Sequence, residues 1–403
     1  MRKRAPLQLP YRGERVPHAV LEVNQCCNLS CLACYKRKSS STKPLPRVLE
    51  EVDRLLALRR LGAITIAGGE PTLHPQLPEI VAYCAGRGLL VQLITNGYGL
   101  TDALLDRCRE AGLADILLHV DSRQGRPDAP PGATEAELDP LRDALVRRVT
   151  GRGIGCSLAL TLYRSTLPEL PAAIERAIAD PRVKRLVVFC CGEIAGGLRR
   201  FAGGEVLGTP YPGADAGAAG DATEAGPGGL TAEEVGIPEV EPLLAALGMA
   251  PYLCVASSRS DAERRWVICY SLALHGRRGA EQVLHLRPPP TRLTSRVVSL
   301  ALRLGRRSRF GRHLRERDCF VLALLHALGC GDLREAGRAL RLCAGRLRPG
   351  TRLAGTALTF QQPAAVSPDG RLVYCRECPD ATVRNGVLVP VCLADHIAGP
   401  DRP

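Results

Sequence analysis

The sequence predicts an α/β fold in which helices surround a parallel sheet, followed by a smaller, cysteine-containing α+β part. From about residue 16 to 200, short apolar runs alternate with longer segments of helical character. This alternation is typical of βα units. Capping residues mark the ends of the helical segments, and the composition changes sharply after residue 202. At 403 residues the chain is long enough for one large domain and a smaller one.

Six apolar runs are the candidate strands. Each is short, rich in β-branched or other large apolar residues, and followed by turn residues. They are His18 to Val23, Ala63 to Ala67, Leu90 to Thr95, Asp115 to Val120, Gly155 to Leu162 and Arg185 to Cys190.

Helices are expected between these strands. Asp102 and Pro168 lie near helix starts, and Gly62 and Gly112 lie near helix ends, as capping preferences predict. The predicted helices are Arg47 to Leu61, Leu77 to Arg87, Thr101 to Ala111, Ala136 to Gly151 and Leu167 to Ala179.

A segment rich in Gly, Ala, Pro and Asp divides the chain. It runs from Gly203 to Gly229 and contains few large apolar residues, which is typical of a flexible linker. We therefore expect a first domain over 1–202, a linker over 203–230 and a C-terminal domain over 231–403.

Composition limits the classes of function. The formal net charge is +13, but aromatic residues make up only 4%, which argues against the stacking platforms of single-stranded nucleic-acid binders. The basic start has no apolar signal region, and no stretch approaches the roughly 20 apolar residues that span a bilayer. Seventeen cysteines without a signal peptide favour metal ligation and buried thiols over disulfides, so a cytoplasmic location is expected.

The most informative motif is C-x3-C-x2-C, formed by Cys27, Cys31 and Cys34 and followed by Tyr35. Three thiolates on one short loop can hold three corners of a [4Fe-4S] cube and leave one iron open for a ligand. Cys26 is a poor fourth ligand because adjacent side chains of an extended segment diverge. Zinc is the alternative metal, although closed zinc sites normally have four ligands.

A second motif, Gly68-Gly69-Glu70-Pro71, ends the second predicted strand. Two glycines allow the backbone to approach a ligand closely, because no Cβ intervenes. On its own such a segment would be an ordinary turn.

Together the two motifs resemble the radical S-adenosylmethionine (radical SAM) enzymes. The resemblance covers roughly the first half of the chain and implies a partial (βα)6 TIM-type barrel. It implies that the open iron chelates SAM, and that the reduced cluster cleaves SAM to a 5′-deoxyadenosyl radical that takes hydrogen from a substrate. It assigns the SAM amino group to Gly68, Gly69 and Glu70, and implies a flavodoxin-like or ferredoxin-like electron donor.

Two further residues follow barrel strands at the end where such barrels bind ligands. Asn96 closes the third strand, and Asp121 closes the fourth, where a carboxylate could hold a ribose hydroxyl of SAM. Each has an ordinary structural alternative, since Asn-Gly is a common turn and Asp-Ser a common helix cap.

A second cysteine group lies near the C-terminus and consists of Cys375, Cys378 and Cys392. A C-x2-C pair followed by another cysteine is a metal-binding signal. The stretch Asp369 to Cys375 loosely resembles the start of auxiliary [4Fe-4S] domains, so a second, auxiliary [4Fe-4S] cluster is expected. Its fourth ligand could be Cys319, Cys330, Cys343 or none; a zinc knuckle completed by His396 is the alternative.

The segment 292–309 has apolar residues at helical spacing interleaved with arginines. A basic amphipathic helix can contact an anionic membrane surface, or it can pack on the protein core.

The leading hypothesis is a radical SAM enzyme that modifies an unactivated C–H position of a peptide, protein or small molecule. An alternative is a radical SAM enzyme acting on a lipid or other hydrophobic substrate by C–C coupling or methylation. A more distant alternative is a non-catalytic zinc protein that binds a partner or nucleic acid. The substrate itself does not follow from the sequence, because one fold supports many reactions.

Overall fold

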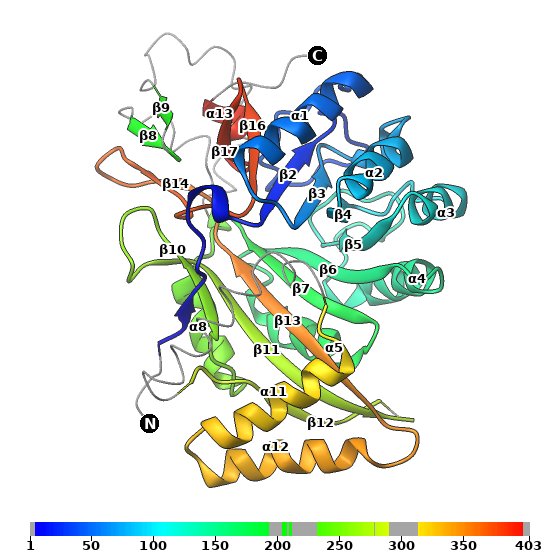
Figure 1. The fold of residues 1–403 in the computed structure, drawn as a ribbon, viewed down its shortest axis with the longest axis vertical. Coiled ribbons are helices and arrows are strands. Elements are labelled where there is room, and N and C mark those ends of the chain that lie inside the picture. Colours follow the sequence, from blue (N-terminus) through cyan, green and yellow to red (C-terminus); the bar gives the residue numbers. More distant parts are fainter. Residues whose placement is uncertain are drawn as a thin grey trace.

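The computed structural model describes residues 5–192, 204–207, 209–211, 232–277, 279–289 and 313–397. Its main element is an eleven-stranded sheet (Figure 1). Ten strands lie in the order β1-β10-β11-β13-β7-β6-β5-β4-β3-β2, and β12 pairs with β11 beside this path.

Six parallel strands form the larger part of this sheet and follow one another in chain order. The bounds of β3, β4 and β6 are those predicted, and the others differ by one or two residues. The strands are β2 (His18–Glu22), β3 (Ala63–Ala67), β4 (Leu90–Thr95), β5 (Leu113–His119), β6 (Gly155–Leu162) and β7 (Val183–Cys190). Parallel βα units in this order form a partial (βα)6 barrel, so the predicted fold class is confirmed.

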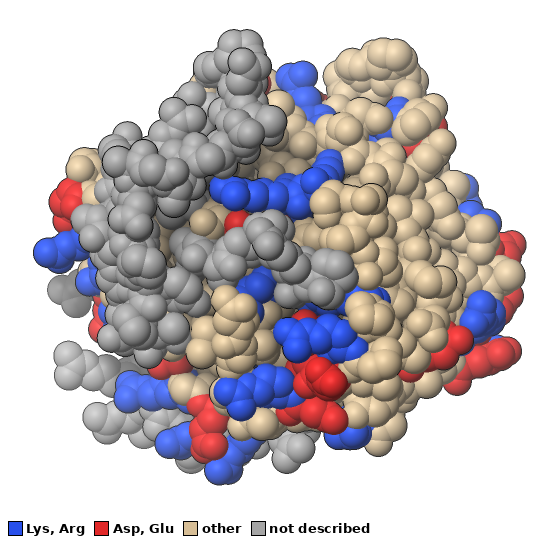
Figure 2. All heavy atoms as spheres, turned by 90° about the horizontal axis from the view of Figure 1, so that it is seen from above, with Lys and Arg blue, Asp and Glu red and all other residues tan. Residues whose placement is uncertain are grey.

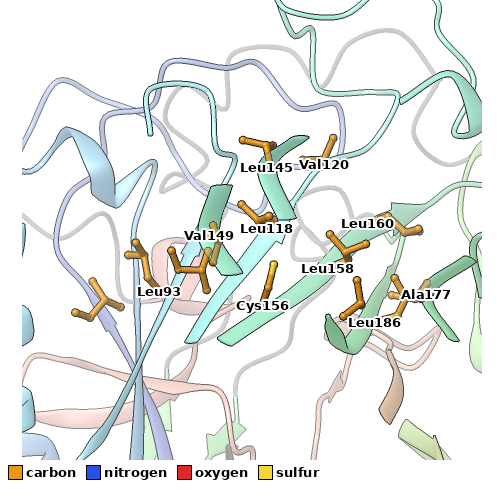
Figure 3. Close-up of a cluster of buried hydrophobic side chains, with 14 of the residues drawn as sticks. Leu93, Leu118, Val120, Leu145, Val149, Cys156, Leu158, Leu160, Ala177 and Leu186 are labelled. Atoms are coloured by element: carbon orange, nitrogen blue, oxygen red, sulfur yellow. The ribbon is translucent and has the colours of Figure 1, made fainter. Parts of the chain in front are cut away.

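A helix follows each of the first five barrel strands, as predicted. The helices are α1 (Leu45–Leu58), α2 (Leu77–Gly86), α3 (Asp102–Glu110), α4 (Asp139–Thr150) and α5 (Leu170–Ala179), and short 3-10 turns (Gly13–Arg15, Pro71–Leu73, Ala136–Leu138, Leu167–Glu169) complete this half. Figure 3 shows the core between these layers, with Leu118 beside Leu145 and Val149 of α4. Burial of each large apolar side chain contributes about 1.5–3 kcal/mol.

A buried polar network closes the barrel interior near the amino ends of its strands. The Asp115 carboxylate accepts hydrogen bonds from Arg185 (2.7 Å), His313 (2.7 Å) and Ser157 (3.2 Å). This part of the barrel interior is therefore occupied by the protein's own charged and polar side chains.

Strands from the C-terminal half extend the same sheet. β13 (Arg352–Gln361) pairs in parallel with β7, and β11 (Arg264–Gly276) pairs antiparallel with β13. β10 (Leu253–Ala256), β12 (Gly279–His285) and β1 (Leu7–Gln8) complete the sheet. The expected division at 203–230 thus separates chain segments that contribute to one sheet.

The remaining elements pack around the ends and faces of this sheet (Figure 1). Helices α11 (Glu316–Gly329) and α12 (Leu333–Arg346) pack at the end that contains Arg352, and α8 (Ile237–Ala246) covers β11. The small hairpins are β8 (Gly204–Val206) with β9 (Thr209–Tyr211), β14 (Ala365–Val366) with β15 (Leu372–Val373), and β16 (Ala381–Arg384) with β17 (Val387–Pro390), followed by α13 (Ala394–Ile397).

Two predictions fall on other parts of the chain. They concern the linker 203–230, most of which lies outside the described residues, and the basic segment 292–309, all of which does. Within the described ranges, no helix combines the length and apolar character needed to cross a membrane. Figure 2 shows Lys and Arg side chains interspersed with Asp and Glu over the face seen from above.

Candidate functional site

The C-x3-C-x2-C loop begins directly after β2 and is fixed to neighbouring loops by its backbone. The amide of Gln25 donates to the carbonyl of Ser41 (2.9 Å), which closes the loop on itself. The amides of Ser30 and Leu32 donate to the carbonyls of Gln124 (3.2 Å) and Arg123 (2.9 Å), in the loop after β5. The cysteine loop therefore lies over the carboxyl ends of the barrel strands.

The three thiols of this loop act on one another electrostatically. Burial is the main cause that raises the pKa of Cys31 to about 12, and the neighbouring Cys34 and Asp121 contribute to the rise. Burial also raises the pKa of Cys27, which the nearby Lys38 opposes. A bound metal deprotonates such thiols outright, so this donor set fits a cluster that compensates thiolate charge.

Gly68 and Gly69 pack against the cysteine loop itself. A Cβ on Gly69 would lie 2.1 Å from the Cys26 carbonyl oxygen, and one on Gly68 would lie 2.3 Å from Asn24 Oδ1. The amide of Glu70 donates to the Cys26 carbonyl at 2.7 Å. The close approach that both glycines allow is to the protein's own cysteine loop, and their assigned contact with SAM stays a prediction.

The Glu70 carboxylate joins the ends of β3 and β4. It accepts hydrogen bonds from the amide and hydroxyl of Thr72 (3.0 and 2.6 Å), the Thr95 hydroxyl (2.7 Å) and the Asn96 amide (2.8 Å). Burial raises the pKa of Glu70, and these hydrogen bonds oppose the rise. Its assigned contact with SAM stays a prediction.

Asn96 and Asp121 both lie beside the cysteine loop. The Asn96 side-chain amide is 2.8 Å from Asn28 Oδ1 and 3.9 Å from Cys27 Sγ. The Asp121 carboxylate accepts from the Arg123 amide (2.9 Å) and the Thr161 amide (3.2 Å). The structure thus brings Asn96 and Asp121 together with the three cysteines and the Gly-Gly-Glu segment, although Asp121 already has several donors.

Two residues of this site were missed by the sequence interpretation. Tyr163 directly follows β6, and its buried hydroxyl forms no well-aligned hydrogen bond. Burial and the nearby Asp121 raise its pKa, and the Ala33 backbone in the cysteine loop opposes the rise. His119 Nε2 lies 3.0 Å from the Asp121 carboxylate and 3.1 Å from the Thr161 hydroxyl. Polar residues at alternate positions of an apolar strand, such as His119 and Asp121, are the signal that could have identified this interior face.

The C-terminal cysteines lie near one another, with Cys375 and Cys378 buried and Cys392 half-buried. Cys375 and Cys378 pack together with Val255 and Trp266. The backbone of Cys375 also pairs with that of Ser257, after β10, in an isolated antiparallel β-bridge. Contact with Cys375, and burial, raise the pKa of Cys378; burial raises that of Cys392 to about 12, with Cys378 nearby.

Buried cations beside these thiols favour a thiolate-bound metal. Arg59 donates to the Cys378 carbonyl (2.8 Å), while its Nε has no partner. Arg265 lies close enough to Cys392 to lower the pKa of that thiol. The Nε and one terminal nitrogen of Arg265 have no hydrogen-bond partner. Among the described residues, no three His, Cys, Asp or Glu side chains converge on the position of a single metal ion. An iron–sulfur cluster binds each thiolate through a different iron, so its ligands do not have to converge on one point.

The cysteines considered as fourth ligands lie elsewhere, which leaves the alternative that no fourth cysteine is present. Cys319 and Cys343 belong to the apolar cluster of α11 and α12, at the other end of β13. Cys330 follows α11 and contacts the Asp332 carbonyl. His396 Nε2 lies 3.0 Å from the Tyr35 carbonyl, beside the first cysteine loop.

A buried ionic network joins the two cysteine regions. Lys36 lies 2.7 Å from the Glu22 carboxylate and 2.9 Å from that of Asp395. Arg384 pairs with the same two carboxylates, and Asp395 also accepts from the Arg37 amide at 3.0 Å. The two carboxylates and the two cationic side chains have equal and opposite charge, and buried charges are tolerated when they are paired in this way.

Comparison with known proteins gives a family match over residues 21–154, to the radical SAM superfamily. The PqqA peptide cyclase of Methylobacterium sp. (strain 4-46) is 32% identical over 165 residues, which cover 39% of this chain and 42% of that protein. The Fe-coproporphyrin III synthase of Methanosarcina barkeri is 25% identical over 187 residues, 45% of each chain. The chain thus spans less than half the length of these curated relatives.

Among solved structures, Streptococcus suis SuiB bound to precursor peptide SuiA aligns with a TM-score of 0.37 and 15% identity, over 45% of this chain and 41% of that chain. The fold assignment therefore depends on the strand order described above. The chain thus contains a radical SAM superfamily domain over residues 21–154, which includes the three-cysteine loop and the parallel strands β3, β4 and β5.

Proposed function

We propose that the chain is a radical SAM enzyme in which Cys27, Cys31 and Cys34 hold a [4Fe-4S] cluster with one open iron. The observation that carries the proposal is the contact of Asn96 with Cys27 Sγ at 3.9 Å, because it joins the cysteine loop to the carboxyl end of a barrel strand. When bound, such a cluster supplies the electron that cleaves SAM to a 5′-deoxyadenosyl radical.

The chain's own residues supply position and shielding. Glu70 holds the ends of β3 and β4 in register, and the Gly-Gly backbone seats the cysteine loop on them. Asn96, Asp121 and the buried hydroxyl of Tyr163 are the polar groups available to SAM or substrate. The closed amino end of the barrel keeps water from entering on that side.

Cys375, Cys378 and Cys392 are proposed to hold an auxiliary [4Fe-4S] cluster. The unpartnered nitrogens of Arg59 and Arg265 support this assignment, since buried cations require nearby negative charge. An electron donor of the flavodoxin or ferredoxin type would reduce the first cluster, and a cytoplasmic location would suit both clusters.

A peptide is the substrate class that we favour, because one of the relatives is named PqqA peptide cyclase. An auxiliary cluster suits the removal of an electron from a substrate radical during crosslinking or oxidation. The lipid hypothesis depends on the basic segment 292–309, which lies outside the described residues.

The test is a SAM cleavage assay on anaerobically purified, iron–sulfur-reconstituted protein. With dithionite, the wild type should form 5′-deoxyadenosine, measured by mass spectrometry, and the Cys27→Ala/Cys31→Ala/Cys34→Ala variant should form none. Candidate peptides added to parallel reactions should increase the yield if a peptide is the substrate. Bound zinc in place of iron, or no 5′-deoxyadenosine from fully loaded protein with or without peptides, would contradict the proposal.

A further inference from the structure

Two buried arginines beside the C-terminal cysteines lack a close acidic partner. Of the five buried arginines in the described ranges, Arg126, Arg142 and Arg384 form close ion pairs with Asp or Glu. Arg59 instead donates to backbone carbonyls, those of His18 and Cys378, each at 2.8 Å, and the carboxylates of Glu377 and Asp380 act on it only from beyond ion-pair distance. Arg265 reaches only Glu263, at 3.5 Å.

Arg265 is oriented by an irregularity in the sheet. Val255 pairs with Trp266 and Ala256 with Arg264, so Arg265 is the extra residue of a β-bulge. Bulges re-aim a side chain and are frequent next to active sites. The side chain of Arg265 is 3% exposed, whereas that of its one partner Glu263 is 43% exposed. Water therefore screens the partner charge far more than the guanidinium.

This arrangement is unfavourable unless negative charge lies nearby. The effective cost of burying an ion without a partner is several kcal/mol. Trp266, next to Arg265, packs on Cys375 and Cys378, and Arg59 binds the Cys378 carbonyl. As neutral thiols these cysteines give no charge, but as thiolates on a metal cluster they would compensate both guanidinium groups.

We propose that Arg59 and Arg265 are the counter-cations of the iron–sulfur cluster held by Cys375, Cys378 and Cys392, and that they raise its reduction potential. The inference rests on the auxiliary cluster of the proposed function. Reduction adds negative charge to a cluster, and a fixed cation nearby favours the reduced state. Net charge and solvent exposure are among the factors that set cluster potentials. A guanidinium suits the role because it is permanently charged and weakly hydrated.

The test uses the full chain with Cys27, Cys31 and Cys34 changed to alanine, so that only the C-terminal cluster remains. In this background Arg265→Met removes the charge, Arg265→Lys keeps it, and Arg60→Met removes an exposed charge next to Arg59. Arg60 is paired with Glu14 at 2.9 Å and its side chain is 67% exposed. Iron content and the midpoint potential are measured for each variant by metal analysis and by spectroscopic redox titration.

For Arg265→Met we expect bound iron and a more negative potential, with the reduced-to-oxidised ratio at fixed potential falling at least tenfold, equivalent to about 59 mV for one electron. The midpoint potential of Arg265→Lys should be close to the wild-type value, and that of Arg60→Met should equal it. An iron-loaded Arg265→Met protein with unchanged potential would overturn the role of Arg265. Absence of iron in the background protein would overturn the auxiliary cluster itself, and SAM cleavage by the wild type would still test the first site separately.

Discussion

Lys36 and Asp395 lie 359 positions apart in the sequence, and their side chains meet in a fully buried ion pair at 2.9 Å. Lys36 follows the last cysteine of the first loop by two residues, and Asp395 follows Cys392 by three. The pair therefore connects the two cysteine regions, and Glu22 and Arg384 complete the charge balance around it.

Removal of one charge from this network should destabilise the protein strongly. Asp395→Asn removes the charge of one of the two carboxylates that contact Lys36 and Arg384, and we expect a loss of about 3–5 kcal/mol in the free energy of unfolding. Urea titration measures this loss. The control Asp369→Asn breaks an exposed pair with Arg259 and should cost no more than about 1 kcal/mol. Equal losses in the two variants would contradict the role given to the network.

The same carboxylate should make stability depend on acid pH. Burial alone would raise the pKa of Asp395, but Lys36, the Arg37 amide and Arg384 hold it below its ordinary value of 3.8. Because the folded-state pKa is lowered, the stabilisation is complete well above pH 3.8 and is lost as pH falls through the folded-state value. Unfolding free energies at several pH values should show this loss in the wild type, and a smaller slope below about pH 4 in Asp395→Asn.

Gly69→Ala should displace the first cysteine loop. The added methyl group would lie 2.1 Å from the Cys26 carbonyl oxygen, so we expect a loss of about 1–3 kcal/mol and reduced iron at the N-terminal site. Gly86→Ala is the matched control, because nothing lies within 4 Å of the added Cβ at the end of α2. Normal iron content and stability in Gly69→Ala would show that the loop can accommodate the contact.

Cys392→Ala should remove iron, whereas Cys343→Ala should not. Two four-iron clusters give ~8 irons per chain, and loss of an auxiliary ligand should reduce this toward ~4. Cys343 is buried in the apolar cluster of α11 and α12, so its replacement should affect stability alone. Metal analysis of the two reconstituted proteins measures their iron content per chain. Full iron content in Cys392→Ala would exclude Cys392 as a required ligand.

Tyr163→Phe should separate ligand binding from stability. The buried hydroxyl of Tyr163 forms no well-aligned hydrogen bond, so its removal should not lower the free energy of unfolding. If SAM or substrate uses this hydroxyl, affinity should fall about 5- to 30-fold, equivalent to 1–2 kcal/mol. Equilibrium binding of SAM and of an active substrate to the cluster-loaded variant measures this; unchanged affinity for both would remove Tyr163 from the site.

The barrel half could be predicted because its information is local. Strands such as Ala63–Ala67 and Gly155–Leu162 are continuous apolar runs, as expected for parallel strands buried on both faces. The continuation of the sheet through β13 and β11 could not be predicted in this way. Pairing between Val187 and Thr359 joins segments far apart in the chain, and neither segment carries a local signal for its partner.

The candidate site shows the same division. The motifs correctly indicated which segments lie at the carboxyl edge of the barrel, since strand ends meet there. They did not indicate that Gly69 packs on Cys26, or that Arg59 and Arg265 lie beside the second cysteine group. These contacts depend on tertiary packing, and single arginines in an arginine-rich sequence give no warning of burial.

The ionic link between Lys36 and Asp395 also has a consequence for biogenesis. A ribosome delivers the first cysteine loop long before it delivers Asp395 and Arg384, and until then Lys36 has Glu22 alone to balance its charge. The loop thus gains this part of its native support only when β16 and α13 have emerged and docked, after its backbone bonds to the barrel loops can form. Insertion of the first cluster is consequently expected to be a post-translational event, after the nascent chain has passed residue 395.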